Sequence, residues 1–452
     1  METLKSTTHD MDLAASEKGL WKHALLWLMF LGPFFFLSYG FANSLAASQT
    51  DIGSIVYNWE HSIPFIPWTI VPYWSIDLLY GLSLFICTSK AELNNHAKRL
   101  LTAQVVAVTC FILFPLGFSF ERPEASGLFG GMFTALYEFD QPYNQAPSLH
   151  IALLVILWAL FVKHVPGWLR WPLHIWSGLI AISVLTTFQH HFIDIPTGAA
   201  LGLLCLWLWP DSRHRVFDIK SLPHVQRRLR LAMFYFCGSA VLFVTGIIWG
   251  GLGLWLLWPA LSLLLVSIFY TLIGSDGFQK SPDGNMNLAI KWLLYPYLLG
   301  ARINSRIWTK NDESADHIHD DVWLGCFPST QVIKVNNFRT IIDLTAEFFA
   351  PRLEHKTETK WHSLPSLDLI TPSETTLTQA AALIEESREK GAVLVSCALG
   401  YSRSALAVIA WLLITERAKD IDSAVGVVKA KRPKIVLKDD DRQVLLNLKT
   451  AK

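Results

Sequence analysis

GAVLVSCALGYSRS, residues 391–404, is the stretch that decides the fold of the C-terminal part of this 452-residue chain. Residues 391–396 have the continuous apolar character of a buried strand, and an apolar helical stretch follows from Ala405 to Leu413. A strand, a tight loop and a helix start together form a nest of backbone N–H groups that binds a phosphate dianion. The stretch therefore predicts a phosphate site. It lies in an α/β domain, because β-like runs alternate with helical periodicity from about Asp316 onward.

The residue types in the loop are those of a phosphoryl-transfer site. Cys397 is the candidate nucleophile, Arg403 is suited to hold two equatorial phosphate oxygens, and Ser404 to stabilise the thiolate when a phosphocysteine is hydrolysed. The leaving group needs a proton, and we expect Asp368 to supply it from another loop. Asp343 lies within a predicted strand and is interpreted as structural. The backbone expected to hold the phosphate belongs to Ala398, Leu399, Gly400, Tyr401 and Ser402.

The loop Cys397-x5-Arg403, with Asp368 upstream, resembles the dual-specificity branch of the protein tyrosine phosphatases. The similarity spans residues 320–450 and includes Trp323-Leu324-Gly325 and Lys431-Arg432-Pro433. It implies an α/β domain of the cysteine-phosphatase type that acts through a phosphocysteine. Two departures are Ser396, where the family usually has histidine, and the lack of lysine in the loop, which speaks against highly phosphorylated inositides as substrates.

The N-terminal part of the chain has the composition of a membrane protein. Apolar residues make up 52% of the sequence, which includes 19 tryptophans. A net charge of +1 argues against nucleic-acid binding, and six cysteines without a CxxC motif argue against a disulfide framework or zinc site. We expect a multi-pass α-helical membrane domain with eight spans, at residues 24–44, 68–88, 100–120, 150–168, 171–189, 192–209, 231–250 and 252–273. The first span is too long for a signal-peptide core.

Lys and Arg in the connecting loops predict the orientation of the spans, because short cytoplasmic loops hold the excess. The loops after spans two, four and six are basic, whereas Arg122 is the one cation in the loops on the other side. Both termini are therefore expected in the cytoplasm. The basic loop residues are Lys90, Lys98, Arg99, Lys163, Arg170, Arg213, Arg215, Lys220, Arg227, Arg228 and Arg230.

Changes in composition predict four segments. A cytoplasmic N-terminus covers residues 1–23, the membrane domain 24–273, a linker 274–315 and the phosphatase-like domain 316–452. Within the linker, residues 287–310 mix leucines with basic residues and tryptophans, as in a helix that lies along the lipid headgroups. A ninth span is the alternative, but Lys291 and Pro296 interrupt it.

Two polar motifs in the membrane domain form a second candidate site. They are NQAPSLH (144–150) and QHHFID (189–194), and both fall on the outer face by the charge rule, as does Arg122. His190 and Asp194 share one face if their segment is helical, so His190 is the candidate nucleophile and Asp194 its orienting partner. His150 is the candidate general acid, and Arg122 and Ser148 are candidate phosphate-binding residues. His191 points elsewhere on the helix and is interpreted as structural.

PSLH followed by HxxxD, with Arg122-Pro123 upstream, is similar to the type 2 phosphatidic-acid phosphatase superfamily over residues 68–210. The resemblance implies metal-free chemistry on phosphate esters, often lipids. Pro115 and Val184 stand where the family usually has a lysine and an arginine. That loss is typical of the subgroup similar to inositol-phosphosphingolipid and sphingomyelin synthases, which move head groups between lipids.

The sequence thus predicts a bifunctional phosphatase of the bacterial inner (plasma) membrane, with a histidine site facing the periplasm and a cysteine site in the cytoplasm. The expected substrates are phospholipid-type esters for the first site, and lipid or protein phosphates for the second. No cofactor, metal or nucleic acid is expected. A head-group transferase in the membrane half is one alternative, and a non-catalytic membrane scaffold is another.

Overall fold

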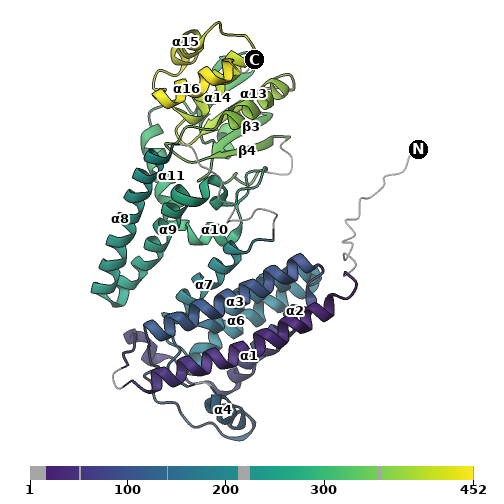
Figure 1. The fold of residues 1–452 in the computed structure, drawn as a ribbon, viewed down its shortest axis with the longest axis vertical. Helices are drawn as coiled ribbons and strands as arrows, with labels where there is room; N and C mark the ends of the chain where they lie inside the picture. Colours follow the sequence, from purple (N-terminus) through teal and green to yellow (C-terminus); the bar gives the residue numbers. More distant parts are fainter. Residues whose placement is uncertain (1–16, 50–51, 140, 212–223, 354–357, 451–452) are drawn as a thin grey trace, which may run out of the picture. The chain divides into compact units, whose positions relative to one another are not determined.

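The computed structural model describes residues 17–49, 52–139, 141–211, 224–353 and 358–450. These residues fall into two compact units, 17–211 and 224–450. The first unit contains only helices, and the second joins a helical hairpin to a five-stranded sheet (Figure 1). The last two predicted spans, 231–250 and 252–273, therefore belong to the same unit as the sheet.

The first unit is a bundle around a continuous core of leucine, isoleucine and alanine side chains. Short 3₁₀ turns lie at Asn58–Ser62 (η1), Pro67–Thr69 (η2) and Gly167–Leu169 (η3). The helices are α1 (Leu20–Ala47), α2 (Ile70–Ile86), α3 (Lys90–Leu113), α4 (Gly127–Phe139), α5 (Leu149–His164), α6 (Arg170–Thr186) and α7 (Asp194–Leu208).

Five helical segments of the described residues are long and apolar enough to cross a membrane: Leu20–Ala47, Pro67–Ile86, Lys90–Leu113, Val225–Trp249 and Gly251–Phe278. The other three predicted spans form α5, α6 and α7, which have 16, 17 and 15 residues and are shorter than expected. Polar residues explain where α6 ends and α7 begins, because the segment Gln189–His191 lies between these two helices. Helix α4, between α3 and α5, was not predicted.

Two glycines bring α5 and α7 together. A β-carbon on Gly198 would lie 2.4 Å from the Ser148 carbonyl oxygen, and one on Gly202 would lie 2.7 Å from the Ala152 carbonyl oxygen. This small-xxx-small spacing allows two helix backbones to approach closely. It places the N-terminus of α7, with Asp194, directly beside the N-terminus of α5, with Ser148.

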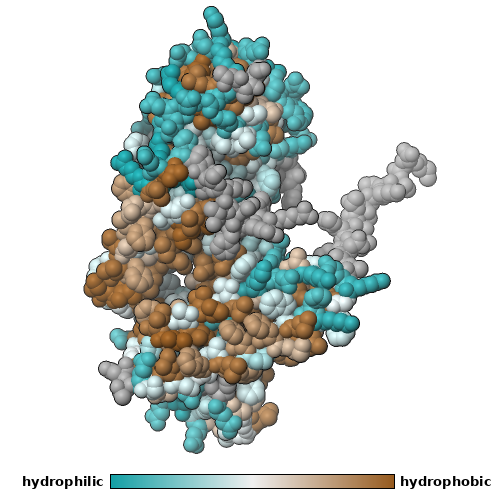
Figure 2. All heavy atoms as spheres, in the orientation of Figure 1, coloured by the Kyte–Doolittle hydropathy of each residue, from teal (hydrophilic) through white to brown (hydrophobic). Residues whose placement is uncertain are grey.

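The second unit begins with an apolar hairpin, residues 225–278. It consists of α8 (Val225–Trp249), η4 (Gly251–Leu256), α9 (Leu257–Ile268), η5 (Phe269–Ile273) and η6 (Gly274–Phe278). Large apolar side chains such as Phe234, Val241 and Ile248 are exposed on α8, and Figure 2 shows the hairpin surface as mostly hydrophobic. Arg227, Arg228 and Arg230 lie on the first turns of α8, whereas Arg213, Arg215 and Lys220 lie outside the described residues.

The sheet has the order β1-β2-β5-β3-β4, with β1 antiparallel to β2 and the other pairs parallel. Apolar side chains alternate between its faces: Val393 and Val395 pack against α13 and α14, and Leu394 faces the cluster beside α12. The α/β domain is thus found as expected. Its elements are β1 (Ala315–His319), β2 (Val322–Cys326), α12 (Thr330–Val335), β3 (Thr340–Thr345), β4 (Lys360–Ser366), α13 (Glu374–Arg388), β5 (Val393–Cys397), α14 (Arg403–Ile414), α15 (Ile421–Lys431) and α16 (Asp439–Thr450).

The segment interpreted as a linker is packed into the second unit. It forms α10 (Leu288–Leu293) and α11 (Tyr295–Thr309), and Pro296 lies in the first turn of α11, where a proline is tolerated. Upstream, the Lys280 ammonium lies 2.5 Å from the Asp343 carboxylate and 2.7 Å from the Thr345 carbonyl oxygen. Both charged side chains are fully buried, so the linker is fastened to β3 by an ion pair.

We expect Lys280→Ala to destabilise the second unit by about 3–5 kcal/mol, because the Asp343 carboxylate would remain buried without its partner. Thermal unfolding of the purified protein, followed by tryptophan fluorescence, measures the change. Lys390→Ala is the control, since Lys390 pairs with Glu386 at the surface and its side chain is 61% exposed. Equal unfolding midpoints for the two variants would contradict the assigned role of Lys280.

Candidate active sites

Three polar groups follow the carboxyl ends of neighbouring parallel strands in the second unit. Cys397 ends β5, Glu347 lies two residues after β3, and Asp368 lies two residues after β4. These strands are adjacent in the sheet, so the three groups meet at one edge. The loop of residues 398–402 then leads into α14, which begins at Arg403.

Cys397 is held with its sulfur toward hydrogen-bond donors. Its Sγ accepts the Gly400 N–H at 3.3 Å and the Ser404 hydroxyl at 3.1 Å, and the residue is 3% exposed. Donors aimed at one sulfur stabilise negative charge on it. The structure therefore brings Cys397 and Ser404 into the contact that the predicted chemistry requires.

The loop is braced from outside through its carbonyl groups. Arg432 donates to the carbonyl oxygens of Leu399 and Gly400 at 3.0 and 2.9 Å, and Ser305 of α11 donates to that of Ala398 at 2.7 Å. Carbonyls turned outward leave the N–H groups of the loop turned inward, as a phosphate needs.

Gly400 is required in this loop by its conformation and by its neighbour. Its φ is +75°, and a β-carbon there would lie 2.6 Å from the carbonyl carbon of Gly325. The Tyr401 carbonyl accepts the Val436 N–H at 2.8 Å, and Ser402 is the N-cap residue of α14. All five predicted loop residues thus lie between the nucleophile and the helix.

Arg403 is buried and lies against two acidic side chains. Its guanidinium donates to both oxygens of Glu347, at 2.6 and 3.0 Å, and to Asp368 Oδ1 at 2.9 Å. Burial alone raises the pKa of Glu347, but the charge and hydrogen bonds of Arg403 outweigh it and lower that pKa below its usual value. Sequence reasoning missed Glu347. Its position just after a strand next to β5 was the available signal.

Asp368 lies beside Arg403 and lines a cavity. Burial raises the pKa of its carboxyl group and outweighs the opposing charge of Arg403, so the proton is retained to higher pH. The Asp368 carbonyl oxygen also accepts the Tyr270 hydroxyl at 3.0 Å, which ties the acid's loop to the hairpin.

In the first unit, the structure joins three of the predicted residues in one chain of hydrogen bonds. His190 Nε2 lies 3.1 Å from Ser148 Oγ, and His190 Nδ1 lies 3.2 Å from Asp194 Oδ2. All three residues are buried. If Nδ1 carries the proton shared with Asp194, Nε2 is the unprotonated nitrogen, as a nucleophile must be.

His150 and Arg122 are placed near this chain without a hydrogen bond to it. The His150 ring stacks on Tyr73 at 4.1 Å, and among the described residues its buried Nε2 has no hydrogen-bond partner. Arg122 donates from Nε to the Phe188 carbonyl at 3.0 Å, two residues before His190. The roles of these two residues stay predictions.

His191 has the surroundings of a structural residue. Its ring lies 4.5 Å from that of Phe118, and its Nδ1 lies 3.2 Å from Glu60 Oε2. The same carboxylate oxygen accepts the Phe192 N–H at 2.8 Å, so Glu60 fixes the segment that carries His190. Glu60 was missed because it lies in η1, far along the chain from His191, and no local pattern marks it.

Comparison with known proteins covers the part of the chain that contains the cysteine site. A profile of the dual specificity phosphatase catalytic domain matches residues 322–450. Similar solved structures include Tk-PTP in its active form, with 26% identity and a TM-score of 0.29 over 31% of this chain and 99% of that chain. PTPMT1 in complex with PI(5)P has 20% identity and a TM-score of 0.29 over 31% of this chain and 96% of that chain. No curated protein matches the chain.

The matched residues contain β2 to β5 and the loop with Cys397 and Arg403. The chain therefore carries a dual-specificity phosphatase domain and is a phosphatase. The residues before 322 lie outside this match.

We expect Asp368→Asn to lower kcat toward phenyl phosphate by about 10²-fold or more, because the leaving phenoxide loses its proton donor. In the unchanged protein the general acid must be protonated. Its raised pKa extends activity to higher pH, and activity falls as the pH rises through that pKa. The substitution should remove this alkaline limb of the pH profile.

Asp422→Asn, on the exposed face of α15, is the matched control and should leave both kcat and the pH profile unchanged. An alkaline limb that persists in Asp368→Asn would show that another group supplies the proton.

Proposed function

We propose that the chain is a membrane phosphatase with two independent sites, one at Cys397 in the cytoplasm and one at His190 on the opposite side of the membrane. The observation that carries the first site is the loop in which Cys397 Sγ accepts two hydrogen bonds next to Arg403 and Asp368. The second is supported by the Ser148, His190 and Asp194 contacts.

At the cysteine site, the Cys397 thiolate attacks phosphorus and an S–P bond forms as the ester P–O bond breaks. Asp368 gives its proton to the departing oxygen. Water then attacks the phosphocysteine and gives a proton to the Asp368 carboxylate, which releases inorganic phosphate and restores the thiolate. Arg403, oriented by Glu347, holds the equatorial oxygens, and Ser404 stabilises the sulfur as it leaves.

At the histidine site, His190 Nε2 attacks phosphorus while Asp194 holds the proton on Nδ1. His150, whose Nε2 has no partner among the described residues, donates the proton to the leaving oxygen. Arg122 and Ser148 bind phosphate oxygens. Water then attacks the phosphohistidine and gives a proton to His150, so the N–P bond breaks, phosphate leaves and both histidines return to their starting state.

Five helical segments suited to crossing a membrane support placement in a lipid bilayer. The excess of Lys and Arg in the loops after spans two, four and six supports cytoplasmic termini in an inner (plasma) membrane. This arrangement offers the histidine site phospholipid-type esters and the cysteine site lipid or protein phosphates. Pro115 and Val184 favour a second candidate for the histidine site, transfer of the phosphoryl head group to a lipid alcohol in place of water.

Two single variants, Cys397→Ser and His190→Ala, test the proposal in sealed vesicles that hold the protein in one orientation. Cys397→Ser should lower the hydrolysis of an aryl phosphate added on the cytoplasmic side by at least about 10³-fold. It should leave the release of phosphate from phosphatidate in the opposite leaflet unchanged, and His190→Ala should have the reverse effect.

Cys237→Ser and His23→Ala, at exposed positions, are the matched controls. Loss of both activities in either active-site variant would contradict two independent sites. Phosphatidate consumed without free phosphate, in the presence of a lipid alcohol, would identify the histidine site as a transferase.

A further inference from the structure

We propose that the cysteine site takes a phosphate monoester of a membrane glycerolipid, and that the apolar hairpin forms the part of the site that receives the lipid's tail. This inference rests on the proposed phosphatase activity of Cys397 and narrows its substrate from lipid or protein phosphates to lipid phosphates. A cavity in the second unit carries the argument.

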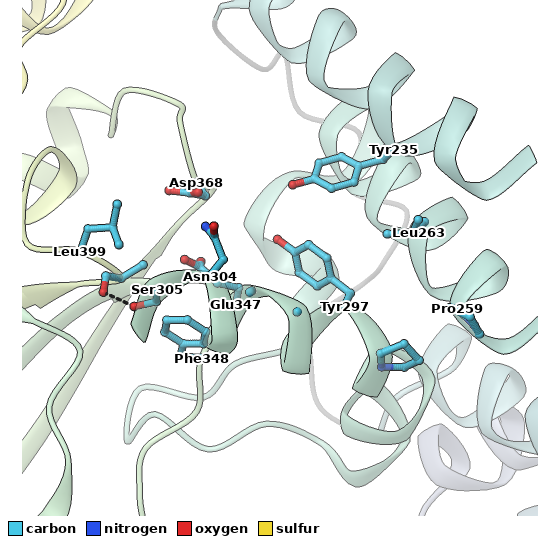
Figure 3. A pocket seen from close by; sticks show the side chains of 14 residues that line it. Tyr235, Pro259, Leu263, Tyr297, Asn304, Ser305, Glu347, Phe348, Asp368 and Leu399 are labelled. Atoms are coloured by element: carbon cyan, nitrogen blue, oxygen red, sulfur yellow. Dashed lines mark hydrogen bonds between the residues drawn. The ribbon is translucent and has the colours of Figure 1, made fainter. Parts of the chain in front are cut away.

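The cavity has a volume of 390 Å³ and extends from the catalytic loops to the hairpin. Figure 3 shows Asp368 and Leu399 on one side of it, and Tyr235, Leu263 and Pro259 of the hairpin on the other. Three successive turns of one face of α11 line its length, as the pairs Pro296 and Tyr297, Gly300 and Ala301, and Asn304 and Ser305. The small pair in the middle leaves the space open.

The charged groups of the lining lie at one, polar end of this length. The catalytic end has the Glu347 and Asp368 carboxylates and Asn304, together with Phe348 and Leu399, whereas the hairpin end has Pro259 and Leu263 (Figure 3). The hydroxyls of Tyr235 and Tyr297 point toward the polar end (Figure 3). A lipid phosphate has a matching order of groups along its length: a charged phosphate, a short polar linker and a hydrocarbon tail.

Hydrogen bonds fix the hairpin to the loop of Asp368 and α11 to the loop of Cys397, so the cavity is a built part of the site. Tyr270 donates to the Asp368 carbonyl at 3.0 Å, and Ser305 of α11 donates to the Ala398 carbonyl at 2.7 Å. Helix α10 is joined to α9 by the bond from Trp258 Nε1 to the Trp292 carbonyl at 3.0 Å. The apolar wall therefore has a defined position relative to Cys397.

The outward face of α11 fits the headgroup region of a bilayer. Leu299, Ile303 and Ile307 recur every four residues and are 45%, 49% and 69% exposed. Next to this stripe runs a basic stripe of Arg302, Arg306 and Lys310. Such a helix lies in the interface, with its apolar side in the acyl region and its cations at anionic headgroups.

A phosphopeptide fits this cavity less well than a lipid. A peptide backbone that reached the hairpin end would place N–H and C=O groups against Pro259 and Leu263, where unpaired polar groups are unfavourable. An acyl chain has no such groups and gains from burial. The chemistry of the wall therefore favours a lipid substrate.

Gly300→Leu tests the inference, because a β-carbon at Gly300 meets no atom within 4 Å and the added side chain would fill the cavity without a backbone clash. The matched control is Gly426→Leu on α15, where a β-carbon also meets nothing within 4 Å. Both changes replace a helical glycine by a good helix former, so folding should be preserved.

The assay uses the full chain with His190→Ala, in detergent micelles that contain dioleoyl phosphatidate, with para-nitrophenyl phosphate and a phosphotyrosine peptide as the other substrates. Gly300→Leu should lower kcat/KM for phosphatidate by about tenfold or more relative to its effect on the aryl phosphate. Gly426→Leu should change neither. Phosphatidate should be hydrolysed faster than the phosphopeptide.

The lipid assignment would be overturned if Gly300→Leu lowered kcat/KM equally for phosphatidate and the aryl phosphate, or if the phosphopeptide were hydrolysed faster than phosphatidate. In either case, hydrolysis of the aryl phosphate that depends on Cys397 would leave the proposed function intact. A protein that hydrolyses none of the three substrates would overturn the proposed function itself.

Discussion

The pairing of buried charge is the constraint on which both candidate sites depend. Arg403 has a side chain only 3% exposed, and its positive charge is tolerated because Glu347 lies against it with two hydrogen bonds. In the first unit, the buried Asp194 carboxylate lies 3.2 Å from Nδ1 of the buried His190 imidazole. Each pair also fixes the orientation of a phosphate-binding or attacking group. The hydrogen bonds that compensate for burying these side chains are therefore the same bonds that orient them for the reaction.

The second unit joins a sheet of the phosphatase domain to an apolar hairpin and to α11. The sheet places Cys397, Glu347 and Asp368 at one edge, as expected for neighbouring parallel strands. The hairpin and α11 then add hydrogen bonds to the loops of Asp368 and Cys397. Because these bonds come from segments outside residues 322–450, the active site is larger than the domain that the family profile matches.

The sequence was sufficient to predict contacts between residues of the same short segment. The loop from Cys397 to Arg403 and the pair His190 and Asp194 follow from local geometry, and the structure places them together. Glu60 and Tyr270 were not found, because each reaches its partner across a long stretch of chain and depends on packing that no local pattern encodes. Glu347 was missed although it follows a predicted strand, because the sequence does not show that this strand pairs with β5. The same reason explains why residues 274–315, interpreted as a linker, pack into the second unit through the buried pair of Lys280 and Asp343.

The central claim is that the two sites face opposite sides of one membrane. Single cysteines at exposed Glu124 and Lys431, introduced into a chain with Cys237→Ser, report the side of each site to a membrane-impermeant maleimide in sealed, oriented vesicles. The account predicts that reagent added outside labels one of the two positions, and that the other is labelled only after the vesicles are permeabilised. Labelling of both positions from the same side of intact vesicles would contradict it.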